Sequence, residues 1–202
     1  MGRALRLKRV ATYLSVAGTV VLALPAVAIA QAMPVIDDFM AEIARGIQAI
    51  HAQAAGDAAK IEAGCGDFLG RYLDTGALAQ AASEEAWTRM SAAQREAYRA
   101  AVAHRLAVEC VRQFAGYKGE PIELMGIRSV AGGDNLATQQ LGNDQTGRMI
   151  AWRVHRAEDG KFHVVDVIWE GHSAVAKARG DFAAVLQGAH GDLDAVIAAM
   201  RK

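Results

Sequence analysis

The chain has 202 residues, 52% hydrophobic and 22% charged, and its 22 Lys and Arg balance 22 Asp and Glu. This length suits a single domain. Without a basic excess, nucleic acid and anionic membrane surfaces are poor electrostatic partners. We therefore expect one globular domain that binds no nucleic acid.

The first 32 residues have the order of a secretory signal peptide. A head with four basic residues precedes an apolar run over residues 10–30, which ends in overlapping small-x-small sites. The run is long enough to span a bilayer, so an uncleaved membrane anchor is the alternative. Pro25 and the small residues favour cleavage. We predict a signal peptide over residues 1–32, cut after Ala32, and a domain over residues 33–202.

Two cysteines, Cys65 and Cys110, remain in the domain, and both lie on the apolar sides of expected helices. Export leads to an oxidising compartment, which favours a disulfide between them. Closing a loop of this length would stabilise the fold by about 4 kcal/mol. The alternative is two buried free thiols. No Cys or His spacing indicates a metal site, and we expect no cofactor.

Apolar periodicity predicts that the first half of the domain is helical. The spacing fits helices over about 35–53, 58–72 and 92–115, with short helical turns before the third. Ser91 and Gln94 form a capping box at the start of the third helix.

The character of the sequence changes after Gly119. Four extended segments follow, at about 121–130, 135–141, 147–157 and 161–170. The breaks between them are rich in Gly, Asn and Asp, which predicts an antiparallel meander. Helices over 173–188, with Ser173 as N-cap, and over 192–201 close the chain. The fold class is therefore α+β: N-terminal helices and a curved four-stranded meander covered by helices, NTF2-like in outline.

The last hairpin can be given a register. A four-residue turn at 157–160 would pair Arg156 with Lys161 and put Arg153 diagonal to Asp166, within reach of an ion pair. One face would then be apolar, with Ile150, Trp152, Val154, Val165, Val167 and Trp169. This face is either a solid core under the helices or, if sheet and helices part, the wall of a hydrophobic cavity. Gly126 and Gly171 are candidate bend sites that could open the sheet.

The stretch Val-Asp-Val-Ile-Trp-Glu-Gly-His-Ser over residues 165–173 resembles the MlaC family of periplasmic phospholipid-binding proteins, also called toluene-tolerance proteins. Two further segments are similar to family motifs: Trp87–Arg95 and the stretch that begins at Gly188. The resemblance covers about residues 35–200. The family positions matched at this stretch and in the helix after it are Asp166, Glu170, Gly171, Ser173, Arg179 and Phe182.

The resemblance implies a periplasmic lipid carrier. It would shuttle a phospholipid between an outer-membrane lipoprotein complex and an inner-membrane ABC transporter with an MCE-domain component, and so maintain outer-membrane lipid asymmetry. Two chains of ~16 carbons expose ~30 methylene groups, so their transfer to water would cost more than about 20 kcal/mol without an apolar cavity. The candidate lining is the apolar sheet face together with Phe68, Leu106 and Phe114.

Two other functions fit the same fold outline. An NTF2-like isomerase or dehydratase would need acid–base residues, for which Asp166 with His155 or His163 with Glu170 are candidates. The register puts Asp166 on the mixed face and His163 at the rim, so we expect no enzyme activity and no catalytic residues. A ligand-free interaction module would result if the helices closed fully on the sheet.

Overall fold

The computed structural model describes residues 25–142 and 147–201. Within these residues the α+β architecture is confirmed: along the chain, five helices precede the strands and two follow them. The helices are α1 (Pro25–Ala54), α2 (Ala58–Tyr72), α3 (Thr75–Ser83), α4 (Glu85–Arg89), α5 (Ala92–Phe114), α6 (Ala174–Gly188) and α7 (Leu193–Met200). The strands are β1 (Ile122–Ser129), β2 (Asn135–Leu141), β3 (Arg148–Arg156), β4 (Phe162–Trp169) and β5 (His172–Ser173).

Most of the proposed signal peptide lies outside the described residues. Helix α1 begins at Pro25 and runs through the proposed cleavage point after Ala32. A cut there would leave Ile36, Met40 and Ile43, which bury one face of α1, in the mature chain. Among the described helices, none combines the length and apolarity that a membrane span needs. The boundary at residue 32 stays a prediction.

Local side-chain caps start most of the later helices where the sequence indicates. Asp57 and Asp74 accept hydrogen bonds from first-turn N–H groups of α2 and α3. Ser91 and Gln94 form the expected capping box at the start of α5. These bonds satisfy N–H groups that have no partner within the helix, so they fix the start of each helix.

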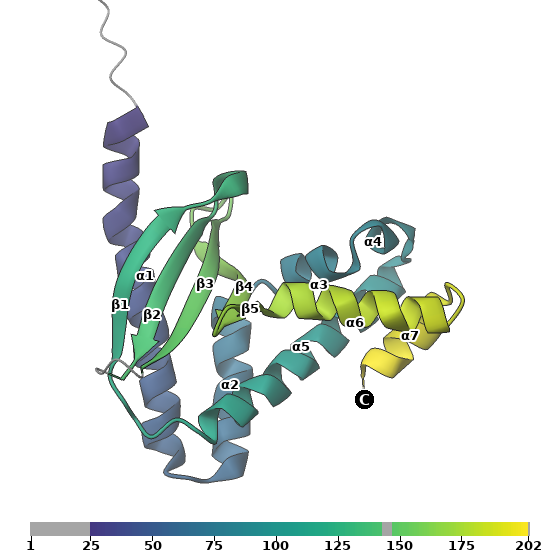
Figure 1. Ribbon diagram of the computed structural model, residues 1–202, viewed down its shortest axis with the longest axis horizontal. Helices are drawn as coiled ribbons and strands as arrows, with labels where there is room; N and C mark the ends of the chain where they lie inside the picture. The colour runs from purple at the N-terminus through teal and green to yellow at the C-terminus, as the bar shows by residue number, and fades with distance from the viewer. Residues whose placement is uncertain (1–24, 143–146, 202) are drawn as a thin grey trace, which may run out of the picture.

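The sheet is fully antiparallel, with the strand order β1-β2-β3-β4-β5. It has one strand more than the four predicted, because the turn after Trp169 returns the chain along β4 for two residues as β5. The register shifts between Leu124 and Gly126, so the first strand bends next to the glycine proposed as a bend site. Figure 1 shows the sheet curving over α1, which runs behind β1, β2 and β3.

The predicted register of the last hairpin is wrong by one residue near its turn. Arg156 pairs with Phe162 instead of Lys161, and Val154 pairs with Val164. A five-residue connection over 157–161 replaces the expected four-residue turn. The side chain of Val164 therefore joins Val154 on the helix-covered face, and both are fully buried.

A β-bulge then shifts the pairing by one more residue, so the rest of the hairpin lies two residues from the predicted register, which leaves Val167 and Trp169 on the predicted face. The shift falls at Arg153 and Val154, opposite the stretch of β4 that holds one extra residue, and beyond it Trp152 pairs with Val167. The extra residue bends the strand and increases its twist. The expected ion pair of Arg153 with Asp166 is also wrong: the Arg153 Nε donates to Asp134 Oδ2 at 2.6 Å.

The helices form two groups around the sheet. Helices α1 and α2 pack together on one sheet face, while α3, α5, α6 and α7 pack on one another. In Figure 1 the second group extends away from the sheet, and α5 and α6 lie apart beside the sheet and approach each other farther from it. Tyr98 of α5 and Phe182 of α6 join this second group through a ring contact of 5.2 Å between centroids.

One buried polar chain joins the first group to the sheet. The Gln139 side chain, 1% exposed, donates from Nε2 to the Met40 carbonyl of α1 at 3.0 Å. Its Oε1 accepts from the Trp152 indole N–H at 2.9 Å. Both polar ends of this buried amide are therefore paired, as burial requires.

Candidate functional site

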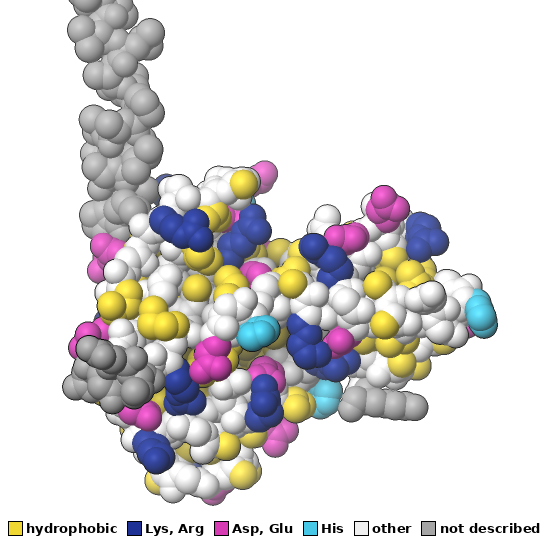
Figure 2. All heavy atoms as spheres, in the orientation of Figure 1, with side chains coloured by type: hydrophobic (Ala, Val, Ile, Leu, Met, Phe, Trp, Pro, Cys, Tyr) yellow, Lys and Arg dark blue, Asp and Glu magenta, His cyan; other side chains and the backbone are white. Residues whose placement is uncertain are grey.

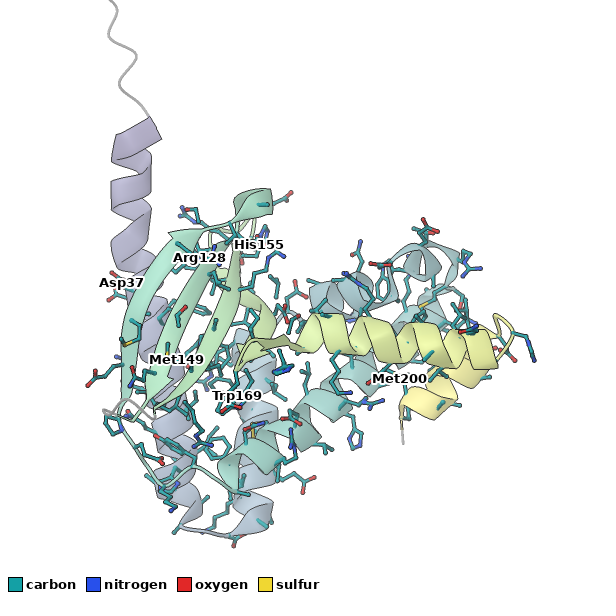
Figure 3. The ribbon with its side chains drawn as sticks, viewed as in Figure 1. Asp37, Arg128, Met149, His155, Trp169 and Met200 are labelled. Carbon is teal, nitrogen blue, oxygen red and sulfur yellow. A yellow bond between two sulfur atoms is a disulfide. The ribbon has the colours of Figure 1, made fainter. Side chains whose placement is uncertain are left out.

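A cavity of about 630 Å³ lies between the sheet and helices α2, α5 and α6. Its inner wall is mostly apolar and aromatic. Trp169, labelled in Figure 3, is the last residue of β4 and borders the cavity. The sheet and helices therefore stand apart here instead of closing on one another. Of the two alternatives for the apolar sheet face, a solid core or the wall of a hydrophobic cavity, the structure has the cavity wall.

Seven of the nine proposed lining residues border the cavity: Phe68, Leu106, Phe114, Ile150, Trp152, Val167 and Trp169. Val154 and Val165 do not border it. Val154 is fully buried in the core, where it pairs with Val164. Val165 is half-buried and lies at the bulge, where the alternation of side chains along β4 breaks.

Sequence reasoning missed several apolar residues of the wall. Val102 lies one turn before Leu106 on the same stripe of α5, so helical spacing could have indicated it. Tyr117 and Leu141 come from a loop and from β2, and no local pattern indicates that they meet. Val175 enters from the first turn of α6 because β5 turns that helix back toward the cavity.

A disulfide joins Cys65 and Cys110, with 6.0 Å between their Cα atoms. Cys65 is fully buried on α2, and Cys110 is among the residues that border the cavity. The bond therefore links two walls of the cavity. It closes a sequence separation of 45 residues.

Asp166 organises the entry into α6. Its Oδ2 accepts from the Ser173 hydroxyl at 2.5 Å, and its Oδ1 accepts from the Val175 N–H at 3.0 Å. The Ser173 hydroxyl in turn accepts from the Ala176 N–H at 3.0 Å, as an N-cap does. The 8%-exposed carboxylate thus ties α6 to the sheet and completes the helix cap.

The other motif residues also join α6 to its neighbours. The Arg179 guanidinium pairs with Glu84 at 2.7 Å and donates to the Ala81 carbonyl at the end of α3. Phe182 packs on Tyr98 of α5. Glu170 and Gly171 form the two-residue turn between β4 and β5, and both have positive φ, 48° and 84°. The motif therefore sets the position of one cavity wall.

Charged side chains of both signs border the cavity at its mouth. Asp181 pairs with Lys177 at 2.8 Å and with Arg105 at 3.5 Å. Glu109 pairs with Arg112 at 2.6 Å, and the hydrogen bonds from this guanidinium hold the pKa of the Glu109 carboxyl below its usual value. In Figure 2 basic and acidic side chains lie close together on this face. The mouth is polar and the interior apolar.

The proposed acid–base residues are not assembled into a catalytic site. His155 donates from Nδ1 to Asp134 at 2.7 Å, at the far end of the sheet. Asp166 is engaged with Ser173, and His163 does not border the cavity. Glu170 does border it, without an acid–base partner from this set. The part of the chain that the structure describes also contains no group of His, Cys, Asp and Glu that could hold a metal ion.

This architecture defines a small α+β binding protein whose cavity suits an apolar ligand with a polar end. The family model described as MlaC protein matches residues 37–202, and the chain belongs to this family. Among solved structures it is similar to that of the phospholipid-binding protein from Ralstonia solanacearum in complex with a phospholipid. The TM-score is 0.62 at 16% identity, over 85% of this chain and 93% of that chain. No curated protein matches the sequence.

Proposed function

We propose that this protein is a periplasmic carrier that holds a phospholipid with its acyl chains in the cavity and its headgroup at the mouth. The observation that carries the proposal is the apolar cavity of about 630 Å³ in a chain of the MlaC family. The similar structure from Ralstonia solanacearum was solved with a phospholipid bound, which supports the same ligand class.

The size of the cavity fits this role in energy as well as in shape. If a methylene group takes about the volume of one water molecule, roughly 30 Å³, the cavity holds about 20 of them. At about 0.8 kcal/mol each, shielding them from water contributes about 16 kcal/mol. That would offset most of the cost of removing a lipid from a bilayer. A lipid with two long chains would fill the cavity and still need the helices to move apart or a chain end to stay near the mouth.

The route of the lipid belongs to the same proposal. The carrier would receive or deliver its lipid at an outer-membrane lipoprotein complex and at an inner-membrane ABC transporter with an MCE-domain component. Energy would come from that transporter, and the carrier itself would need no catalytic residues. Export by the signal peptide over residues 1–32 would bring it to the periplasm.

The test compares two substitutions on adjacent residues of β4. Val167 borders the cavity, whereas the half-buried Ile168 does not. A Val167→Asp carboxylate would lose its water when acyl chains enter, at a cost of several kcal/mol, or more than about 100-fold in affinity. Ile168→Asp adds the same charge away from the cavity.

Each purified protein would be extracted with organic solvent and its lipid measured by mass spectrometry, with circular dichroism to check folding. We expect phospholipid with the wild type and Ile168→Asp, and little with Val167→Asp. A folded Val167→Asp protein that keeps wild-type lipid content would count against this cavity as the binding site. A wild type without any lipid, even after incubation with vesicles, would reject the carrier.

A further inference from the structure

Glu170 has features that the carrier function alone does not explain. It borders the cavity at the mouth and is exposed. Its φ of 48° puts it in the left-handed region, at the first position of the β4–β5 turn. Glycine, asparagine and aspartate suit that position in a two-residue hairpin better than glutamate does. Strained backbone of this kind is concentrated at binding sites.

The Glu170 carboxylate is also the unpaired one among the described acidic residues at the mouth. Asp181 is paired with Lys177 and Arg105, and Glu109 is paired with Arg112. Glu170 makes no side-chain hydrogen bond or ion pair to any residue within 25–142 and 147–201. Its backbone N–H donates to the Met149 carbonyl at 3.1 Å, so the turn is held while the carboxylate stays available.

The charges around the mouth are balanced as a set. Three basic residues, Arg105, Arg112 and Lys177, stand beside three acidic ones, Glu109, Glu170 and Asp181. A phosphate group can approach the highly exposed Arg112 and Lys177 side chains, each with 71% of the side chain exposed. A cationic amine on the same headgroup would find the free carboxylate of Glu170.

We propose that Glu170 binds the ammonium group of an amine-bearing phospholipid headgroup, and that this chain therefore prefers zwitterionic aminophospholipids to anionic ones. The inference rests on the proposed carrier function and adds a headgroup class to it. A headgroup with phosphate and a neutral glycerol would leave Glu170 unpaired next to an anion, which lowers its affinity. Because the site is exposed, the expected preference is roughly two- to fivefold.

The experiment loads delipidated protein from vesicles of equimolar phosphatidylethanolamine and phosphatidylglycerol with the same acyl chains. The bound lipids are counted by mass spectrometry. The variants are Glu170→Gln, which keeps the shape of the side chain, and Glu170→Asn, which suits the left-handed turn. The control Glu158→Gln removes the same charge from an exposed residue in the connection at the opposite end of β4.

We expect the wild type and Glu158→Gln to be enriched roughly two- to fivefold in phosphatidylethanolamine, and the lipid bound by both Glu170 variants to have the vesicle ratio. The wild-type enrichment should shrink in 0.5 M salt as the charges are screened. A wild type without enrichment, or Glu170 variants that keep it, would overturn the headgroup site while leaving the carrier intact. A wild type that takes up neither lipid would overturn both.

Discussion

The disulfide gives the most quantitative prediction about this fold. It joins α2 to α5 across a sequence separation of 45 residues. In the chain-entropy description, a loop of that length restricts the unfolded chain by about 4 kcal/mol at 25 °C. For a domain of this size, each kcal/mol changes the melting temperature by about 2–4 °C, so loss of the bond should lower it by about 8–16 °C.

The perturbation can be made in two ways that separate linkage from packing. The double variant Cys65→Ala and Cys110→Ala removes the bond and also some buried volume, since Cys65 is fully buried. Reduction of the wild type with a dithiol removes only the bond. Urea unfolding at 25 °C would give the free energy of each form, with the oxidised wild type as reference.

We expect the reduced wild type to lose about 4 kcal/mol and the double variant somewhat more, because the variant also leaves unfilled space. A loss below about 1 kcal/mol in both forms would refute the entropic reasoning and mean that the unfolded chain is compact without the bond. Since Cys110 borders the cavity, both forms should also retain less lipid.

Two further predictions concern stability. The Tyr98 hydroxyl is buried without a hydrogen-bond partner among the described residues, and burial raises the pKa of this phenol well above 10. Because the pKa of Tyr98 is higher in the folded state, stability is intact below pH 10 and falls above it. Tyr98→Phe removes the unpaired hydroxyl, so it should raise the unfolding free energy by about 1 kcal/mol. It should also flatten the alkaline loss of stability in a pH series of thermal melts. An unchanged alkaline loss would show that another group causes it. Ser173→Ala removes the cap of α6 and a partner of Asp166, and should cost about 1–2 kcal/mol in urea unfolding, whereas a neutral effect would mean that the Val175 N–H alone holds the carboxylate.

The sequence predicted the features that depend on local periodicity. The helices α1, α2 and α5 follow a 3.6-residue apolar repeat, and turn chemistry separates the strands of the sheet. The resemblance to the MlaC family is also confirmed, over residues 37–202. These patterns depend on residues that are close together in the sequence, so they can be found without the tertiary structure.

The last hairpin shows where local reasoning stops. Strict alternation along β4 puts Val165 beside Trp152. The observed pairing places Val167 there, because the turn is one residue longer than expected and a bulge at Val165 adds one residue more. No glycine in β4 marks the position of the bulge, so the alternation of apolar residues does not show where the strand takes up its extra residue.

The cavity itself could not be predicted from apolar pattern alone. A sheet face with Ile150, Trp152 and Val167 would have the same sequence if the helices closed on it. The position of α6, which forms one wall, depends on the local bonds of Asp166 with Ser173 and Val175 and on the contacts of Arg179 with the distant Ala81 and Glu84. The unpaired Glu170 was in the recognised motif, but its place at the mouth follows only from the folded turn.

The bonds of Gln139 matter more in a hollow protein than they would in a solid one. A domain that keeps part of its interior empty for cargo gives up some of the interlocking contacts that normally select one arrangement of its helices. Apolar contacts alone would let α1 slide along the sheet. The Gln139 amide, bonded at one end to Met40 and at the other to Trp152, allows one position of the helix only. Helix α1 can then stay fixed on the sheet while the helices of the opposite cavity wall adjust to the ligand. One side of the molecule is therefore rigid, and the other side adapts to what it binds.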